Sequence, residues 1–189
     1  PASEEAPAAP AGERSEKRVP MTRLRKTIAN RLLEAASSEP KAPHLSDFIR
    51  LALFTGARRG ELLGLEWSRV DLRANIIHLE AIHTKSARPR VLPLNQEARQ
   101  ALIGRMKFRA EQSPDAPYVF VNRRGQRITS VKKSFRTACN RAGITDFRIH
   151  DLRHTFASWL VRKGVPLLNV SRVLGHSTIK MTERYAHLE

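Results

Sequence analysis

Four stretches with helical spacing of apolar residues each end at a glycine. These regularly placed helix ends constrain the fold more than any other feature of the sequence. The four glycines are Gly56, Gly143, Gly164 and Gly175. Glycine is favoured directly after a helix because it adopts the left-handed conformation that terminates a helix at little steric cost. The pattern therefore predicts a chain built mainly of helices that end at these positions.

Together the patterns predict a mainly α domain with a small antiparallel sheet (α+β). Alternation over residues 74–82 and 88–94 predicts a β-hairpin with Lys85 at its turn. Ser46 and Ser177 are the expected N-caps of the first and last helices of this domain. The expected helices cover residues 47–55, 60–68, 96–110, 131–142, 150–163, 166–174 and 178–187, and a short strand is expected over 118–122.

The first forty residues differ in character from the rest, which predicts three regions. Residues 1–20 are rich in alanine, proline and glutamate, and such a segment favours a disordered linker. Residues 21–40 contain an amphipathic basic helix followed by a connector. Residues 41–189 are the expected folded domain.

Positive charge is concentrated in residues 41–189, which hold 27 Lys and Arg but 12 Asp and Glu. Such a domain suits a polyanion, because cations that neutralise phosphates release counterions. A soluble basic domain or a ribosome-associated protein is the alternative that charge alone leaves open. The single cysteine, Cys139, argues against a disulfide framework or a thiolate metal cluster. We find no membrane span or signal peptide, so the expected location is cytoplasmic.

Three short boxes hold residue types that can attack a phosphate without a metal. They are Thr55–Leu62, His150–Thr155 and Leu174–His176, the last of which leads to Tyr185. A guanidinium donates two parallel hydrogen bonds to a phosphate. A tyrosine nucleophile needs its proton removed and the developing charge stabilised. The boxes therefore predict one phosphodiester-cleaving site.

Each box has a simpler interpretation when it is taken alone. His150 and Arg153 share a helix face that we expect to lie opposite the core stripe, and a solvated polar face is the commoner fate of such pairs. Arg58 could cap a helix or lie on the surface, and Arg59 is an adjacent alternative. Tyr185 could be an ordinary residue near a helix end.

Taken together, the boxes resemble the tyrosine recombinase (phage integrase) family in order and spacing. The matching patterns are Thr-Gly-x-Arg-x-x-Glu-Leu, His-x-x-Arg-His-Thr and Leu-Gly-His followed by Tyr. The resemblance covers about residues 36–189 and implies the catalytic-domain fold of that family. It selects Arg58 over Arg59 and matches Lys85 to the family's hairpin lysine. The implied catalytic residues are Arg58, Lys85, His150, Arg153, His176 and Tyr185.

The resemblance implies a DNA recombinase or integrase that cleaves and rejoins DNA through a 3′-phosphotyrosyl intermediate, without a cofactor or a metal. It makes Tyr185 the nucleophile and Lys85 the general acid. The implied roles of the others are a phosphate clamp (Arg58, Arg153), a hydrogen-bond donor (His176) and a base or orienting group (His150). The implied partners are double-stranded DNA and further copies of the chain in a tetramer, with no membrane and no small-molecule substrate. A nucleoid-associated protein of bacterial or phage origin is expected.

Residues 1–35 resemble a different family, the linker and first catalytic-domain helix of dihydrolipoamide acyltransferases. We find no match to that family's His-x-x-x-Asp-Gly motif, so a fusion without acyltransferase activity is expected. This segment stands where recombinases usually carry a core-binding domain. A catalytically silent DNA-binding fragment is therefore one alternative, with weak, salt-sensitive DNA binding, and a type IB topoisomerase is another.

Overall fold

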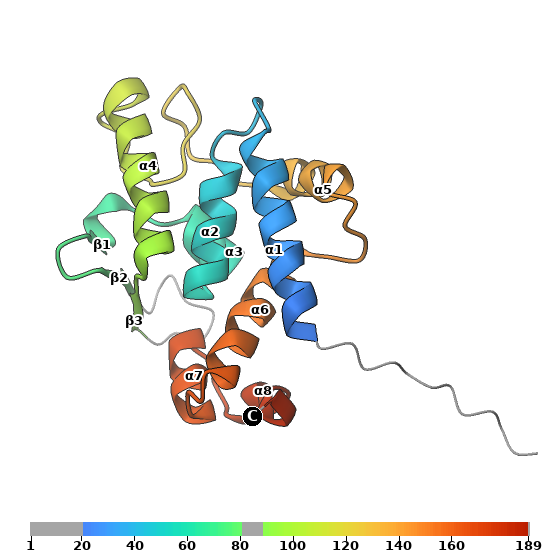
Figure 1. Cartoon of the computed structure of the whole chain (residues 1–189). Coiled ribbons are helices and arrows are strands. Elements are labelled where there is room, and N and C mark those ends of the chain that lie inside the picture. The colour runs from blue at the N-terminus through green and yellow to red at the C-terminus, as the bar shows by residue number, and fades with distance from the viewer. Residues whose placement is uncertain (1–20, 81–88, 189) are drawn as a thin grey trace, which may run out of the picture.

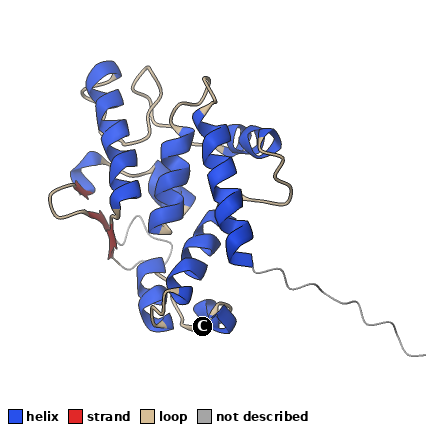
Figure 2. Cartoon of the chain, in the orientation of Figure 1, coloured by secondary structure: helices blue, strands red, loops and turns tan. Residues whose placement is uncertain are grey.

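Figure 1 shows the computed structural model, which describes residues 21–80 and 89–188. Helices make up most of it, and a three-stranded antiparallel sheet lies at one edge, as Figure 2 shows. The predicted fold class, mainly α with a small antiparallel sheet, is confirmed.

The helices are α1 (Met21–Ser37), α2 (Leu45–Thr55), α3 (Arg59–Leu63), α4 (Gln96–Gln112), α5 (Lys132–Arg141), α6 (Ile149–Arg162), α7 (Leu167–Leu174) and α8 (Lys180–Glu183), with 3₁₀ helices η1 (Trp67–Arg69) and η3 (Ala186–Leu188). The strands are β1 (Val70–Asp71), β2 (Ile76–Leu79) and β3 (Arg90–Pro93).

Helix α2 forms the centre of the main core, where it packs against α1, α4 and α6 (Figure 1). Its side chains Phe48, Leu51 and Leu53 are fully buried, and the Phe48 ring meets Phe120 edge-on at 5.7 Å between centroids. A second, smaller apolar cluster joins α6 and α7 to the C-terminal residues and includes Tyr185. The nucleophile proposed from the sequence is therefore anchored by packing.

Helix α1 contributes to the main core. It packs against α2, α5 and α6, and it buries Ala29, Leu32 and Ala36. The Arg31 guanidinium also donates a hydrogen bond to the carbonyl of Ala142, at the end of α5. The amphipathic helix predicted in residues 21–40 is thus docked on residues 41–189.

Three local expectations from the sequence are wrong. Ser46 is not the N-cap of α2, because the helix begins at Leu45 and His44 occupies the cap. The helix expected over 60–68 ends at Leu63 and is followed by η1. The strand expected over 118–122 forms only isolated bridges, from Tyr118 to Glu66 and from Val121 to Arg127, because its backbone bonds go to two different segments.

The last expected helix, 178–187, is broken. Only α8 is α-helical, and Tyr185 lies in the turn between α8 and η3. The Tyr185 amide bonds to the carbonyl of Thr182, a three-residue step that interrupts the four-residue pattern of an α-helix. Ser177 is not its N-cap, since α8 begins at Lys180 and Ile179 occupies the cap position.

The sheet has the order β1-β2-β3, and both pairs are antiparallel. In the β2–β3 pair, Ile76 lies opposite Pro93 and Leu79 lies opposite Arg90. Strand β2 thus begins two residues later than predicted and β3 ends one residue earlier, while residues 81–88 of the predicted hairpin lie outside the described residues. The expected turn lysine, Lys85, lies outside the described residues. None of the described helices combines the length and the apolar character needed to span a membrane.

Candidate active site

Arg153 is held by the ends of two helices. Only 4% of its surface is exposed, and its guanidinium donates to the carbonyls of Gly56 and Leu174, the first at 2.6 Å. These carbonyls lie where α2 and α7 end, and such groups lack partners within their own helix. The expectation that Arg153 lies on a face opposite the core is therefore wrong, because two helix ends supply its buried acceptors.

Glycine is required at the ends of both helices. Gly56 and Gly175 have φ values of 65° and 63°, in the left-handed region. A β-carbon at Gly56 would come within 2.4 Å of the Phe156 ring, and one at Gly175 within 2.8 Å of the Arg90 guanidinium. The helix-ending glycines predicted from the sequence thus also leave room for the side chains that pack around the site.

Arg58 lies at the N-cap of α3 and is fixed from two sides. Its guanidinium donates to the Gly175 carbonyl at 3.0 Å and to the Glu61 carboxylate at 3.1 Å. The other Glu61 oxygen accepts from Arg90 at 2.7 Å. Glu61 therefore orients Arg58, while the adjacent Arg59 is exposed and lies outside this network.

The site carries more positive than negative charge. Burial raises the pKa of Glu61, but the hydrogen bond and charge of Arg90, together with Arg58, outweigh burial and leave that pKa below its usual value. Burial and the charge of Arg58 lower the pKa of Arg153 to about 9, so its guanidinium remains charged at neutral pH. Glu61 is thus the one carboxylate near three arginines, two of which it binds directly. The excess of positive charge favours an anionic ligand.

The two predicted site histidines are neutral at neutral pH. Desolvation and the charge of Arg153 lower the pKa of His150, which lies at the rim of the site. The same two causes lower the pKa of His176 to about 4. Nδ1 of His176 is hydrogen-bonded to the hydroxyl of the fully buried Thr182 at 2.7 Å. This bond fixes the ring, so Nε2 is the nitrogen left for a ligand.

Tyr185 is buried, with 6% of its surface exposed, and its hydroxyl is hydrogen-bonded to Nδ1 of His154. The ring of His154 also meets the ring of His150 edge-on, with 4.6 Å between centroids. His154 belongs to the second box but was not among the predicted site residues. Its spacing of four from His150 was the signal in the sequence that placed both on one helix face.

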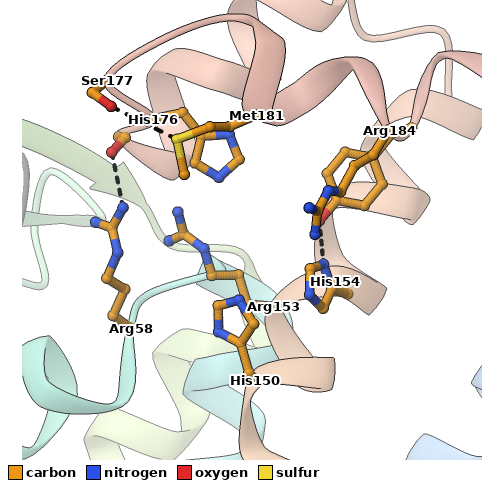
Figure 3. A pocket seen from close by; sticks show the side chains of 10 residues that line it. Arg58, His150, Arg153, His154, His176, Ser177, Met181 and Arg184 are labelled. Atoms are coloured by element: carbon orange, nitrogen blue, oxygen red, sulfur yellow. Dashed lines mark hydrogen bonds between the residues drawn. The ribbon is translucent and has the colours of Figure 1, made fainter.

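These side chains line a cavity of about 340 Å³. Figure 3 shows Arg58 and Arg153 reaching into it from one side and His176 from the other, with His154 and Arg184 beyond them. Five of the six predicted residues lie here, and the sixth, Lys85, is outside the described part of the chain. The lining residues are Arg58, His150, Arg153, His154, Gly175, His176, Ser177, Met181, Arg184 and Tyr185.

Besides His154, two further residues of the site were not predicted, Arg90 and Arg184. Arg90 comes from β3 and binds Glu61, while Arg184 directly precedes Tyr185. The described residues include no cluster of three or more His, Cys, Asp or Glu side chains that could hold a metal ion. The site therefore consists of cations, imidazoles and one phenol around an open cavity.

Comparison with known families matches residues 22–189 to the phage integrase family. The chain belongs to the phage integrase family. It is 36% identical over 157 residues to the integrase of Salmonella phage P22, which covers 76% of this chain and 39% of that protein. It is 34% identical over 179 residues to the tyrosine recombinase XerC of Pseudomonas syringae pv. tomato, which covers 93% of this chain and 58% of XerC.

Among solved structures, the catalytic domain of the bacteriophage HP1 integrase is 30% identical, with a TM-score of 0.64. That likeness covers 85% of this chain and 84% of the HP1 domain. The chain spans about half the length of the curated relatives it matches. The family match begins at residue 22 and so includes α1, whose resemblance to an acyltransferase helix stays a prediction.

Proposed function

We propose that this chain is the catalytic domain of a site-specific DNA recombinase, which cleaves and rejoins DNA through a 3′-phosphotyrosyl bond. The observation that carries this proposal is the convergence of five side chains on one cavity from α3, α6 and the segments that follow α7 and α8. Residues as far apart as Arg58 and Tyr185 meet there. Family membership supports the same chemistry.

In the proposed reaction, the Tyr185 hydroxyl oxygen attacks the scissile phosphate, and the bond to the 5′ oxygen breaks. Arg58 and Arg153 bind the non-bridging oxygens, and their positive excess stabilises the charge that develops on them. Lys85 is the proposed general acid for the 5′ oxygen. The covalent bond to Tyr185 conserves the energy of the phosphodiester, so religation needs no nucleotide.

The remaining roles follow from the geometry around the phosphate. His176 is neutral and fixed by Thr182, so its Nε2–H is the proposed donor to a phosphate oxygen. His150 lies beside Arg153 at the cavity rim and acts as a base or an orienting group. None of these proposed steps requires a metal or another cofactor.

The proposed partner is double-stranded DNA, bound by further copies of this chain in a tetramer. The formal net charge of +16 supports a polyanionic partner. We propose a cytoplasmic, nucleoid-associated location in a bacterium or phage, and a role in mobile-element integration. The three-region division of the chain, with an acyltransferase-like helix before residue 41, is part of this proposal.

The proposal is tested with a nicked suicide duplex, which traps a covalent intermediate because the cleaved fragment diffuses away. The chain is incubated with candidate duplexes, denatured and separated on a gel. The unaltered chain is expected to form a covalent adduct, and Tyr185→Phe is expected to form none. An equal adduct yield from Tyr185→Phe would overturn the nucleophile assignment.

Tyr118→Phe is the matched control, because the sequence contains only two tyrosines and Tyr118 lies outside the cavity. This variant is expected to keep the adduct yield of the unaltered chain. DNA binding with no adduct on any duplex would instead favour a catalytically silent DNA-binding module. Relaxation of supercoiled plasmid without site preference would favour a topoisomerase.

A further inference from the structure

We propose that His154 is a catalytic residue that accepts the phenol proton of Tyr185 as its oxygen attacks phosphorus. This inference rests on the proposed function and adds a group to it, since neither the family pattern nor the predicted site assigned His154 a role. If His154 is the base, then of the two roles proposed for His150, base or orienting group, the orienting role remains.

The hydroxyl of Tyr185 is held by His154. The hydrogen bond joins the phenol to Nδ1 of His154 and links residues 31 positions apart. A phenol O–H donates to Nδ1 when the imidazole is neutral and carries its proton on Nε2. In that tautomer His154 is already the acceptor for the proton that must leave the nucleophile.

His150 occupies a different place in the same cavity. Its ring meets the His154 ring edge-on at 4.6 Å, and its pKa responds to desolvation first and then to Arg153. His150 is therefore close to Arg153, one of the two proposed phosphate-binding arginines, while His154 is hydrogen-bonded to Tyr185, the proposed nucleophile. The two histidines of this helix face therefore have different proposed roles: His154 accepts the proton of Tyr185, and His150 helps to orient the groups that bind the phosphate.

A bound phosphate would place negative charge in the cavity that His154 lines. Among the described residues that line the cavity, those around His154 are His150 and Arg153 on its own helix, His176 after α7, and Arg184 and Tyr185 after α8, and none of these described residues is acidic. In the proposed transition state, the negative charge that develops on the phosphate favours an imidazolium in the same cavity, so the interaction is strongest where the barrier lies.

The proton balance is complete. The Tyr185 O–H bond breaks and its proton moves to Nδ1 of His154, while a bond forms between the phenol oxygen and phosphorus. The bond from phosphorus to the 5′ oxygen then breaks, and that oxygen takes a proton from the general acid proposed above, Lys85. On religation the His154 imidazolium returns its proton to the leaving phenol.

The first test is the rate of single-turnover adduct formation on the suicide duplex. His154→Ala is expected to lower the rate about 10²-fold, a typical contribution of a general base, with DNA affinity within about twofold. His154→Gln, which can hold the hydroxyl but cannot accept its proton, is expected to be about as slow. A Gln rate equal to that of the unaltered chain, or an Ala rate within about threefold of it, would overturn the proposal.

Two further readouts separate proton acceptance from a structural effect. Free imidazole is expected to restore part of the His154→Ala rate and to have no effect on the His154→Gln rate. The unaltered chain should lose rate as the pH falls, and both variants should lose this dependence. His78→Ala, at an exposed position of β2, is the matched histidine control and should match the unaltered chain in both readouts.

A second test needs no DNA. A small aryl sulfonyl fluoride transfers its sulfonyl group to a phenol whose proton is being removed, and fluoride leaves. Mass spectrometry of peptides measures the extent of this labelling separately at Tyr118 and at Tyr185. Tyr185 is expected to react faster than the more exposed Tyr118, and His154→Ala should slow Tyr185 about tenfold without changing Tyr118. Equal Tyr185 labelling in both proteins would overturn the role of His154. Slower labelling combined with no DNA adduct would reject the proposed function alone.

Discussion

The cavity and the α2–α4 contact both bury an arginine, but they neutralise its charge differently. In the cavity, Arg153 binds the carbonyls that end two helices, and the nearby carboxylate of Glu61 is bound by Arg58 and Arg90. Arg105 of α4 is 2% exposed and binds the carbonyls of Val119 and Val121. It also has a carboxylate of its own, that of Asp47, at 4.0 Å.

The difference shows what a buried arginine is available to do. Carbonyl dipoles fix the direction of a guanidinium but cancel only part of its charge, whereas a carboxylate neutralises it. The charge of Arg105 is balanced by the carboxylate of Asp47, so its role in the packing of α2 against α4 is sufficient to explain its burial. Arg153 is oriented but not neutralised, so its charge remains for an incoming phosphate.

The largest expected effect follows from changing each arginine to lysine. Arg153→Lys should slow adduct formation about 10²- to 10³-fold, because an ammonium cannot reach both helix-end carbonyls and the phosphate with fixed geometry. Arg105→Lys should leave the rate per folded molecule unchanged. Single-turnover adduct formation on the suicide duplex, normalised to the folded fraction, measures both. Equal losses of rate in the two variants would remove the distinction between the two sites.

A smaller effect is expected on stability, with Glu61 and Asp47 as the matched pair. Glu61→Gln should lower the free energy of unfolding at pH 7 by about 3 kcal/mol, since it leaves Arg58 and Arg90 without their buried carboxylate. The pKa of Glu61 is lowered, so its stabilisation is present above its usual value of 4.5 and is lost as the pH falls below it.

Urea unfolding at pH 7 measures this change against Asp47→Asn. The Asp47 variant should lose less, because its carboxylate lies farther from its arginine and because burial disfavours its charged form. If Asp47→Asn cost as much as Glu61→Gln, the two carboxylates would be equivalent and the comparison would fail.

The sequence predicted what depends on local chemistry. The helix ends at Gly56, Gly143, Gly164 and Gly175 followed from the conformational freedom of glycine, and all four have positive φ. Five of the six polar residues proposed for the site line one cavity, because the chemistry sought in the boxes restricts the residue types, and their catalytic roles stay predictions. Fold class and family followed from these boxes and the hairpin pattern.

The sequence could not predict features that depend on distant contacts. The burial of Arg153 depends on the ends of α2 and α7 meeting beside α6. The bond of His154 to Tyr185 joins residues on separate elements, and the periodicity of α6 carries no information about it. The break in the last helix accompanies the bond of His176 to Thr182, which holds the start of that segment away from a regular helical path.

The smallest expected effect concerns the pH dependence of stability around Arg105. Burial, opposed by Arg105 and Arg50, raises the pKa of Asp47 to about 6. Burial and then Arg105 lower the pKa of His44 to about 4. Folded Asp47 holds a proton that the unfolded chain has lost, so its contribution to stability grows as the pH falls through 6. Folded His44 stays neutral while the unfolded imidazole takes up a proton, so its contribution shrinks as the pH falls below 6.5.

The two opposed contributions should partly cancel in the unaltered chain, and each should appear alone in the variant that removes the other group. Relative to the unaltered chain, Asp47→Asn should lose about 1 kcal/mol of stability between pH 6.5 and pH 5, and His44→Gln should gain about 2 kcal/mol, at about 1.4 kcal/mol per pKa unit. Urea unfolding at the two pH values measures both differences, and His78→Gln should show neither. Slopes of the same sign in both variants would mean that the two groups do not compensate each other. Arg105 would then lie in a cluster as unbalanced as the cavity around Arg153.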